Sequence, residues 1–108
     1  MNRLQKHGSI LHVLKTAKPS IVRHLIKNGS KDLLNVLCEC CYNVIKGNVP
    51  LTHFQKKRLH RYKNTLRTLT TNKRKLTLSK KRQLLQKGGF LGVLLGPVIK
   101  LLGNILQQ

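Results

Sequence analysis

Acidic residues are nearly absent from this chain of 108 residues. It holds 22 Lys and Arg against two acids, Asp32 and Glu39, which gives a formal net charge of +20. We therefore expect neither a paired-carboxylate catalytic site nor a carboxylate cage for Ca²⁺ or Mg²⁺. Internal ion pairs cannot neutralise so many cations, so the neutralising charge is expected from an external polyanion, either nucleic acid or an anionic membrane surface.

Aromatic residues and well-spaced cysteines are scarce as well. With no Trp, two Tyr and two Phe, the chain lacks the usual base-stacking platforms of RNA-binding proteins. Cys38, Cys40 and Cys41 crowd into four positions, which favours a reducing compartment over a secreted disulfide framework. Their spacing on a helix does not converge on a tetrahedral metal, so we expect no metal or other cofactor. Cys40 and Cys41 are predicted to be core residues, with Cys38 at the border of the core.

Catalysis by a thiol would need a histidine and an orienting partner beside the cysteine. His53 and His60 are near in sequence, but no acid is placed to orient them. We therefore expect a protein without enzymatic activity. No signal peptide is expected either, because the apolar stretch over residues 10–14 is short and is interrupted by His12.

Apolar residues at helical spacing and the absence of strand patterns predict an all-α fold. Ser9 is predicted to cap a short first helix, and Pro19 to begin a second helix that Asn28-Gly29 ends. Ser30 is predicted to cap a third helix over 31–46, whose wide apolar arc makes it the central element of a small core.

A further helix is predicted over 53–71, with Thr52 as its cap. One stripe of this helix is apolar and the opposite arc is densely cationic. A short basic helix over 80–87, capped by Ser79, is predicted to follow. The apolar stripe consists of Leu59, Tyr62, Leu66 and Leu69.

Residues 53–87 hold 13 Lys and Arg and no acid. Ordinary solvated faces mix both signs of charge, so this run favours contacts to nucleic-acid phosphates, with an anionic lipid surface or a plain solvated face as alternatives. Phosphate contact without base readout is preferred over a helix-turn-helix regulator, which stays an alternative. The three tightest basic clusters also match nuclear-localisation patches. The candidate nucleic-acid-binding residues are Lys56, Lys57, Arg58, Arg61, Lys63, Arg67, Lys73, Arg74, Lys75, Lys80, Lys81 and Arg82.

The composition changes abruptly after Gly88-Gly89, where an almost wholly apolar tail begins. The tail is shorter than the ~20 residues that span a bilayer, and its Gly and Pro residues weaken a helix. Three alternatives stay open: the tail folds back onto the other helices, docks into a capsid or other partner protein, or inserts into a membrane. Its candidate contact residues are Phe90, Leu91, Val93, Leu94, Leu95, Val98, Ile99, Leu101 and Leu102.

The chain is accordingly divided into a basic domain of three to four helices (1–71), a basic connector (72–87) and an apolar tail (88–108). Double-stranded DNA is the expected partner, with RNA as an alternative, and self-association is a further expectation.

Two stretches, Lys31–Leu51 and Lys80–Leu91, resemble small basic proteins encoded by Polinton/Maverick elements and adintoviruses. The order of basic region, Gly-Gly and apolar tail also resembles the adenovirus core protein X precursor. These resemblances imply a core protein that condenses viral DNA in the virion, and that resides in the host nucleus during assembly. They also imply processing by a viral protease at Gly88-Gly89, although Gln86 departs from the aliphatic residue or Met that the adenoviral protease prefers there.

Overall fold

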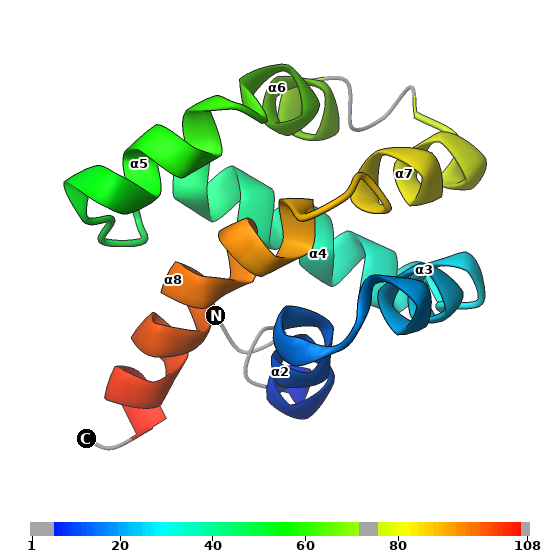
Figure 1. Ribbon diagram of the computed structural model, residues 1–108, viewed down its shortest axis with the longest axis horizontal. Coiled ribbons are helices and arrows are strands. Elements are labelled where there is room, and N and C mark those ends of the chain that lie inside the picture. Colours follow the sequence, from blue (N-terminus) through cyan, green and yellow to red (C-terminus); the bar gives the residue numbers. More distant parts are fainter. Residues whose placement is uncertain (1–5, 72–75, 107–108) are drawn as a thin grey trace.

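The computed structural model describes residues 6–71 and 76–106, and the side chains of residues 6–70 and 76–103. The described residues form seven helices and no strand, so the predicted all-α class is confirmed. Figure 1 shows their arrangement. In chain order the helices are α2 (Gly8–Thr16), α3 (Pro19–Lys27), α4 (Lys31–Ile45), α5 (His53–His60), α6 (Lys63–Thr71), α7 (Leu78–Leu85) and α8 (Phe90–Leu106).

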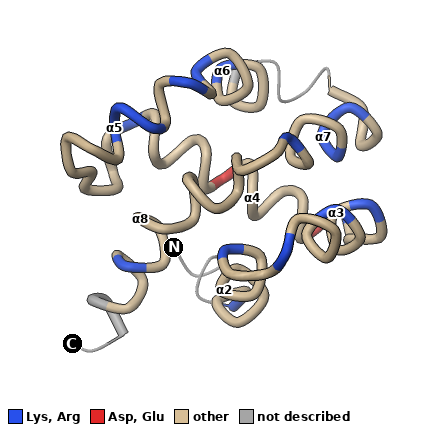
Figure 2. The backbone as a smooth tube through the Cα atoms, in the orientation of Figure 1, with Lys and Arg blue, Asp and Glu red and all other residues tan. Residues whose placement is uncertain are grey.

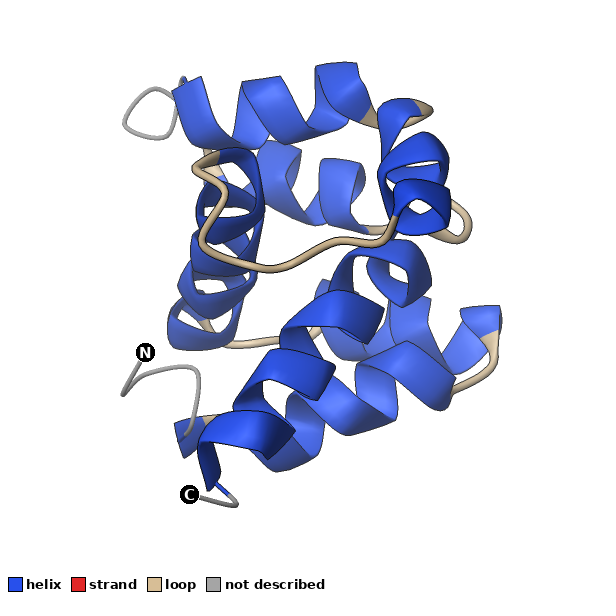
Figure 3. Ribbon diagram, turned by 90° about the vertical axis from the view of Figure 1, so that its left-hand side faces the viewer, coloured by secondary structure: helices blue, strands red, loops and turns tan. Residues whose placement is uncertain are grey.

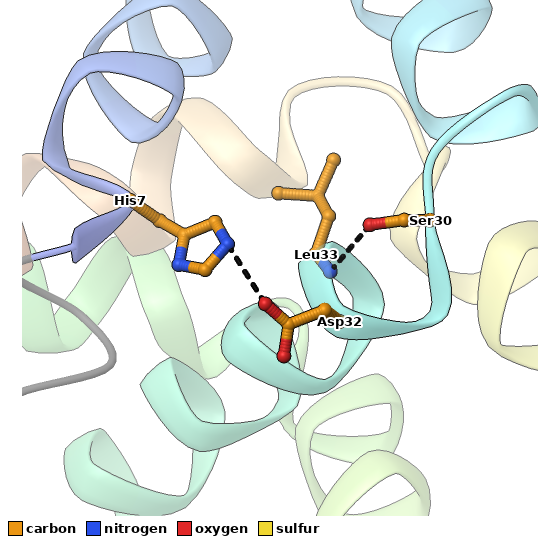
Figure 4. Close-up of polar contacts among 4 residues, drawn as sticks. All are labelled: His7, Ser30, Asp32 and Leu33. Atoms are coloured by element: carbon orange, nitrogen blue, oxygen red, sulfur yellow. Dashed lines mark hydrogen bonds and ion pairs between the residues drawn. The ribbon is translucent and has the colours of Figure 1, made fainter.

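Local signals place several helix ends correctly. Pro19 is the first residue of α3, and the Ser30 hydroxyl accepts the backbone N–H of Leu33 at 3.1 Å, which caps α4 (Figure 4). Two predicted caps are wrong. Ser9 lies inside α2, and Thr77 rather than Ser79 caps α7, so that helix begins two residues earlier than predicted.

A polar contact links the start of α2 to α4. His7 Nε2 lies 3.0 Å from Asp32 Oδ2, and Figure 4 shows the two side chains pointing toward each other. Asp32 also lies in the first turn of α4, where a carboxylate interacts favourably with the positive end of the helix dipole. One of the chain's two acids therefore serves an internal contact.

The core is built around α4 and α8, which contact each other near the centre of the molecule (Figure 1). α4 also contacts α6 and α7, and α8 also contacts α2 and α5. The predicted wide apolar arc of α4 is what makes so many neighbours possible. Its buried residues are Leu33, Leu34, Val36, Leu37, Cys38, Cys40, Cys41 and Val44.

The apolar tail folds back into the protein, as one of the three alternatives expected. The predicted division into domain, connector and tail stays a prediction, but in the described residues helices of the last two segments pack against the helices that precede them. α7, inside the predicted connector, packs against α3, α4 and α6. The radius of gyration is 12.8 Å, and about 13 Å is expected for one compact domain of this length. Of the candidate tail residues, Phe90, Leu91, Leu94, Leu95, Val98 and Leu102 are buried, and Val93, Ile99 and Leu101 are partly buried against them.

The predicted helix over 53–71 is two helices, α5 and α6, with a break at Arg61-Tyr62. At the break the backbone N–H groups of Arg61 and Tyr62 donate three residues back, to Arg58 and Leu59. This tighter turn changes the direction of the chain. Figure 3 colours helices and loops separately, and the longest connection that is described in full runs from the end of α4 at Ile45 to the start of α5 at His53.

The two phenylalanines provide a test of the core. Phe90 is 0% exposed and Phe54 is 66% exposed. Phe90→Ala is expected to lower the free energy of unfolding by about 3–5 kcal/mol, because it leaves a cavity. Phe54→Ala should cost roughly 1 kcal/mol or less, mainly its cation–π contact with Arg58. Urea denaturation followed by circular dichroism measures both, and equal losses would contradict the role of α8 as core.

Candidate nucleic-acid interface

α5 carries the densest group of exposed cations. A capping box fixes its start: Thr52 Oγ1 accepts the Gln55 backbone N–H at 3.1 Å, and Gln55 Oε1 accepts the Thr52 backbone N–H at 2.9 Å. Lys56, Lys57 and Arg58 follow, and all three are exposed, while Leu59 turns into the core. Lys57 and Arg58 also lie in the last turn of α5, where a cation interacts favourably with the negative end of the helix dipole.

Tyr62 fixes the direction of α6 relative to the rest of the protein. Its ring lies 5.4 Å from the Phe90 ring, and its hydroxyl donates to the Gly88 carbonyl at 2.9 Å. A Cβ on Gly89 would lie 3.0 Å from this hydroxyl, and Gly89 has a φ of +78°, so only glycine fits the turn before α8. After Tyr62 in the sequence, Lys63 and Arg67 are exposed on α6.

Within the described residues no Lys or Arg forms an ion pair with a carboxylate. Every described Lys and Arg is exposed except Lys81 and Arg82. Figure 2 shows Lys and Arg on many of the helices, with several on α5, α6 and α7, while both acids belong to α4. The candidate residues on α5 and α6 (Lys56, Lys57, Arg58, Arg61, Lys63 and Arg67) thus form an exposed cationic surface, called here the α5–α6 surface.

The candidate nucleic-acid-binding residues in and before α7 differ in how they are exposed. Lys73, Arg74 and Lys75 lie outside the described residues. Lys80 is exposed as predicted. Lys81 is only 7% exposed and offers little surface to a phosphate, so the structure does not support its predicted role.

Arg82 makes an internal contact. Its guanidinium donates to the Gly29 carbonyl at 2.9 Å, which links α7 to the turn between α3 and α4. Its Nε is buried, so part of the guanidinium faces the protein interior rather than a phosphate, and the role in phosphate binding stays a prediction. A sequence of consecutive basic residues carries no signal that distinguishes this arginine from its neighbours.

The cysteines lie in the core, and Cys38, placed at its border by the sequence, is as buried as the others at 1% exposed. Burial raises the pKa of Cys40 to about 12 and that of Cys41 well above its ordinary value, with smaller contributions from neighbouring charges. Neutral buried thiols are poor nucleophiles. Within residues 6–71 and 76–106, no group of three or more His, Cys, Asp and Glu could hold a metal ion.

The proposed processing position, Gly88-Gly89, lies in the exposed turn between α7 and α8. In the part of the chain that the structure describes, no single helix is long and apolar enough to cross a membrane. One pair of helices is long and apolar enough when its members are taken together, by length and composition alone: Leu78–Leu85 and Phe90–Gly103, with a bend of 86° between them.

The structure thus defines an all-helical protein with an exposed cationic surface and an apolar core helix at its C-terminal end. No family model matches the chain, and no curated protein or solved structure is similar to it. Function is therefore argued below from the chain's own residues and from the resemblance that its sequence carries.

Replacing Arg82 and Lys80 by glutamine, one at a time, distinguishes a residue with an internal contact from an exposed one. Arg82→Gln is expected to lower the free energy of unfolding by about 1–3 kcal/mol, because it removes a charge-assisted hydrogen bond to a part-buried carbonyl. Lys80→Gln removes the same charge from an exposed position and should change stability by less than about 0.5 kcal/mol. Thermal or urea unfolding of both variants decides between the two roles.

The thiols should react only after the protein opens. At pH 8 we expect iodoacetamide to modify Cys40 and Cys41 far more slowly in the native protein than in urea, because folding both buries the thiols and raises their pKa. Above the ordinary pKa of 9.0 the unfolded chain loses the Cys40 proton while the folded chain keeps it up to about pH 12, so this group lowers stability as pH rises through that window. Mass spectrometry of the alkylated protein follows the rate, and fast native alkylation at pH 8 would contradict the burial.

Proposed function

We propose that this protein binds double-stranded DNA without sequence specificity and condenses it, as a core or minor component of a virion. The observation that carries the proposal is the unneutralised cationic exterior: no described Lys or Arg is paired with a carboxylate, and nearly all are exposed. A duplex presents one negative charge per ~1.7 Å of its axis, which is the kind of partner that such a surface requires.

The α5–α6 surface is the proposed principal contact. Each lysine or arginine that meets a phosphate releases condensed counterions, so affinity falls steeply with salt. Because lysine acts as a point charge rather than a planar fork, the Lys-rich part of this surface favours backbone contact over base-specific contact. The break at Arg61-Tyr62 divides the surface between two helix axes, which suits contacts along a backbone more than insertion of one long recognition helix into a groove.

The assignment to a virion, and to the host nucleus during assembly, rests on the sequence resemblance to proteins of Polinton/Maverick elements and adintoviruses. A minor virion protein whose tail contacts capsid protein or membrane is less well supported than DNA condensation. The side chains that would make those contacts are buried or partly buried in this fold. An exposed apolar tail would require α8 to leave the core.

The test is a mobility shift on unrelated duplexes across a salt series, together with light scattering to follow condensation. We expect similar affinities for all duplexes and a log–log salt slope of about −0.9 for each phosphate contacted. With 6–10 contacts, affinity would fall roughly 10³–10⁵-fold between 50 and 200 mM salt. Salt-insensitive binding, or selection of one preferred motif from a random pool, would overturn the proposal.

A charge-matched pair of variants locates the contact. Lys56→Gln/Lys57→Gln/Lys63→Gln should make the salt slope shallower by about 0.9 for each lysine that contacts a phosphate. Lys18→Gln/Lys27→Gln/Lys31→Gln removes three exposed cations from outside the α5–α6 surface and should change the slope much less. Equal changes in the two variants would show that the α5–α6 surface is not the principal contact.

A further inference from the structure

Two adjoining hollows form a groove beside α8, which shares Arg58 with the proposed DNA contact. The larger, of about 450 Å³, is lined by Lys15 of α2, Arg58 of α5 and Lys100 of α8. The smaller, of about 200 Å³, extends to Leu51 and Leu101. The hollows share Gln55, Pro97 and Lys100 as lining residues, so they lie side by side along α8.

The floor of the groove is made by residues with small or rigid side chains. Gly92, Gly96 and Pro97 line the larger hollow, and a Cβ on Gly96 would meet nothing within 4 Å. A Cβ at position 96 is therefore accommodated without displacing a neighbour, at a residue that lines the hollow. Pro97 has no N–H to donate to the Val93 carbonyl, which is the helix partner four residues back and belongs to a residue of the same hollow.

The two ends of the groove differ in chemistry. Cations from three separate helices surround the larger hollow, and no acid lines either hollow. The residues that line only the smaller hollow are Pro50, Leu51, Thr52 and Leu101, none of which is charged. From Gly92 to Leu101 the floor covers ten residues of helix, about 14 Å at the usual rise. The groove thus carries three cations at one end and uncharged, mainly apolar residues at the other, with Gln55 and Lys100 between them.

We propose that this groove binds one long-chain fatty acid. Its carboxylate lies among Lys15, Arg58 and Lys100, and its chain runs over Pro97 toward Leu51 and Leu101. Charge complementarity requires an anion at the first end, and burial of apolar surface favours a hydrocarbon chain at the second. A nucleic-acid backbone carries charge along its whole length and would gain nothing at the apolar end.

The proposal is independent of DNA condensation. Two of its three cations, Lys15 and Lys100, are not among the candidate nucleic-acid-binding residues, and Gly96 carries no charge. A variant that fills the groove therefore leaves the α5–α6 surface intact, and the two proposals can fail separately.

Three probes test the chemistry on the full chain. Carboxyl-¹³C laurate is titrated below its micellar concentration and followed by NMR, with dodecyltrimethylammonium and acetate as comparisons. We expect saturable binding of one laurate per chain with a shifted carboxylate signal. The cationic detergent has the same chain with the opposite charge, and acetate has the head group without the chain, so both should bind at least tenfold more weakly. Comparable binding of either comparison would overturn the proposal.

Variants test the location. Gly96→Leu should abolish the one-to-one laurate binding and leave DNA binding unchanged. Lys15→Gln/Lys100→Gln should weaken laurate about tenfold or more, because charge-assisted contacts are lost. Lys18→Gln/Lys27→Gln loses the same charge outside the groove and should bind laurate as the unaltered chain does. Circular dichroism shows whether each variant folds. If Gly96→Leu does not fold, Lys15→Gln/Lys100→Gln still tests the location of the site. Laurate binding that neither groove variant changes would show non-specific attraction to a cationic protein and overturn the proposal.

Discussion

Burial of α8 against α2, α4 and α5 is the interaction on which the rest of the structure depends. A chain with a net charge of +20 repels itself, and its two acids cannot offset that repulsion through ion pairs. Stability must come from apolar area removed from water, at roughly 1.5–3 kcal/mol for each fully buried large side chain. α8 supplies a large share of that area, with Phe90, Leu94, Leu95 and Val98 all at 0% exposed.

This arrangement separates the two kinds of residue in space although the sequence separates them along the chain. Apolar residues of α8 are buried, while cations from the middle of the chain belong to the short helices α5, α6 and α7 (Figure 2). Arg82 is used inside the protein, where it donates to the Gly29 carbonyl. Among the described residues the exposed charges are therefore overwhelmingly positive, with Asp32 as an exposed acid, and this excess is the physical basis of the proposed polyanion partner.

The sequence predicts best what is decided locally. The all-α class and the caps at Ser30 and Thr52 follow from residues within one turn of the helix start, and the structure has them. The break at Arg61-Tyr62 was not predictable in this way, because it accompanies contacts of Tyr62 with Gly88 and Phe90, some 26 residues away in the chain. The burial of Lys81 and the internal hydrogen bond of Arg82 could not be predicted for the same reason, since only tertiary packing distinguishes them from Lys80. The location of the tail stayed open because an apolar segment is equally suited to a core, a partner or a lipid.

Salt acts on the fold and on the proposed DNA contact in opposite directions. Screening weakens the repulsion among the exposed cations and so favours the compact state, whereas the same ions compete with the protein for phosphates. The DNA phosphates would do both tasks at once, because they neutralise the α5–α6 surface while they bind it. A protein held together by an apolar helix and surrounded by unpaired cations is therefore expected to be most stable when its polyanion is bound. The excess positive charge is a cost to the fold, which salt would reduce by screening and a bound polyanion would reduce by neutralisation.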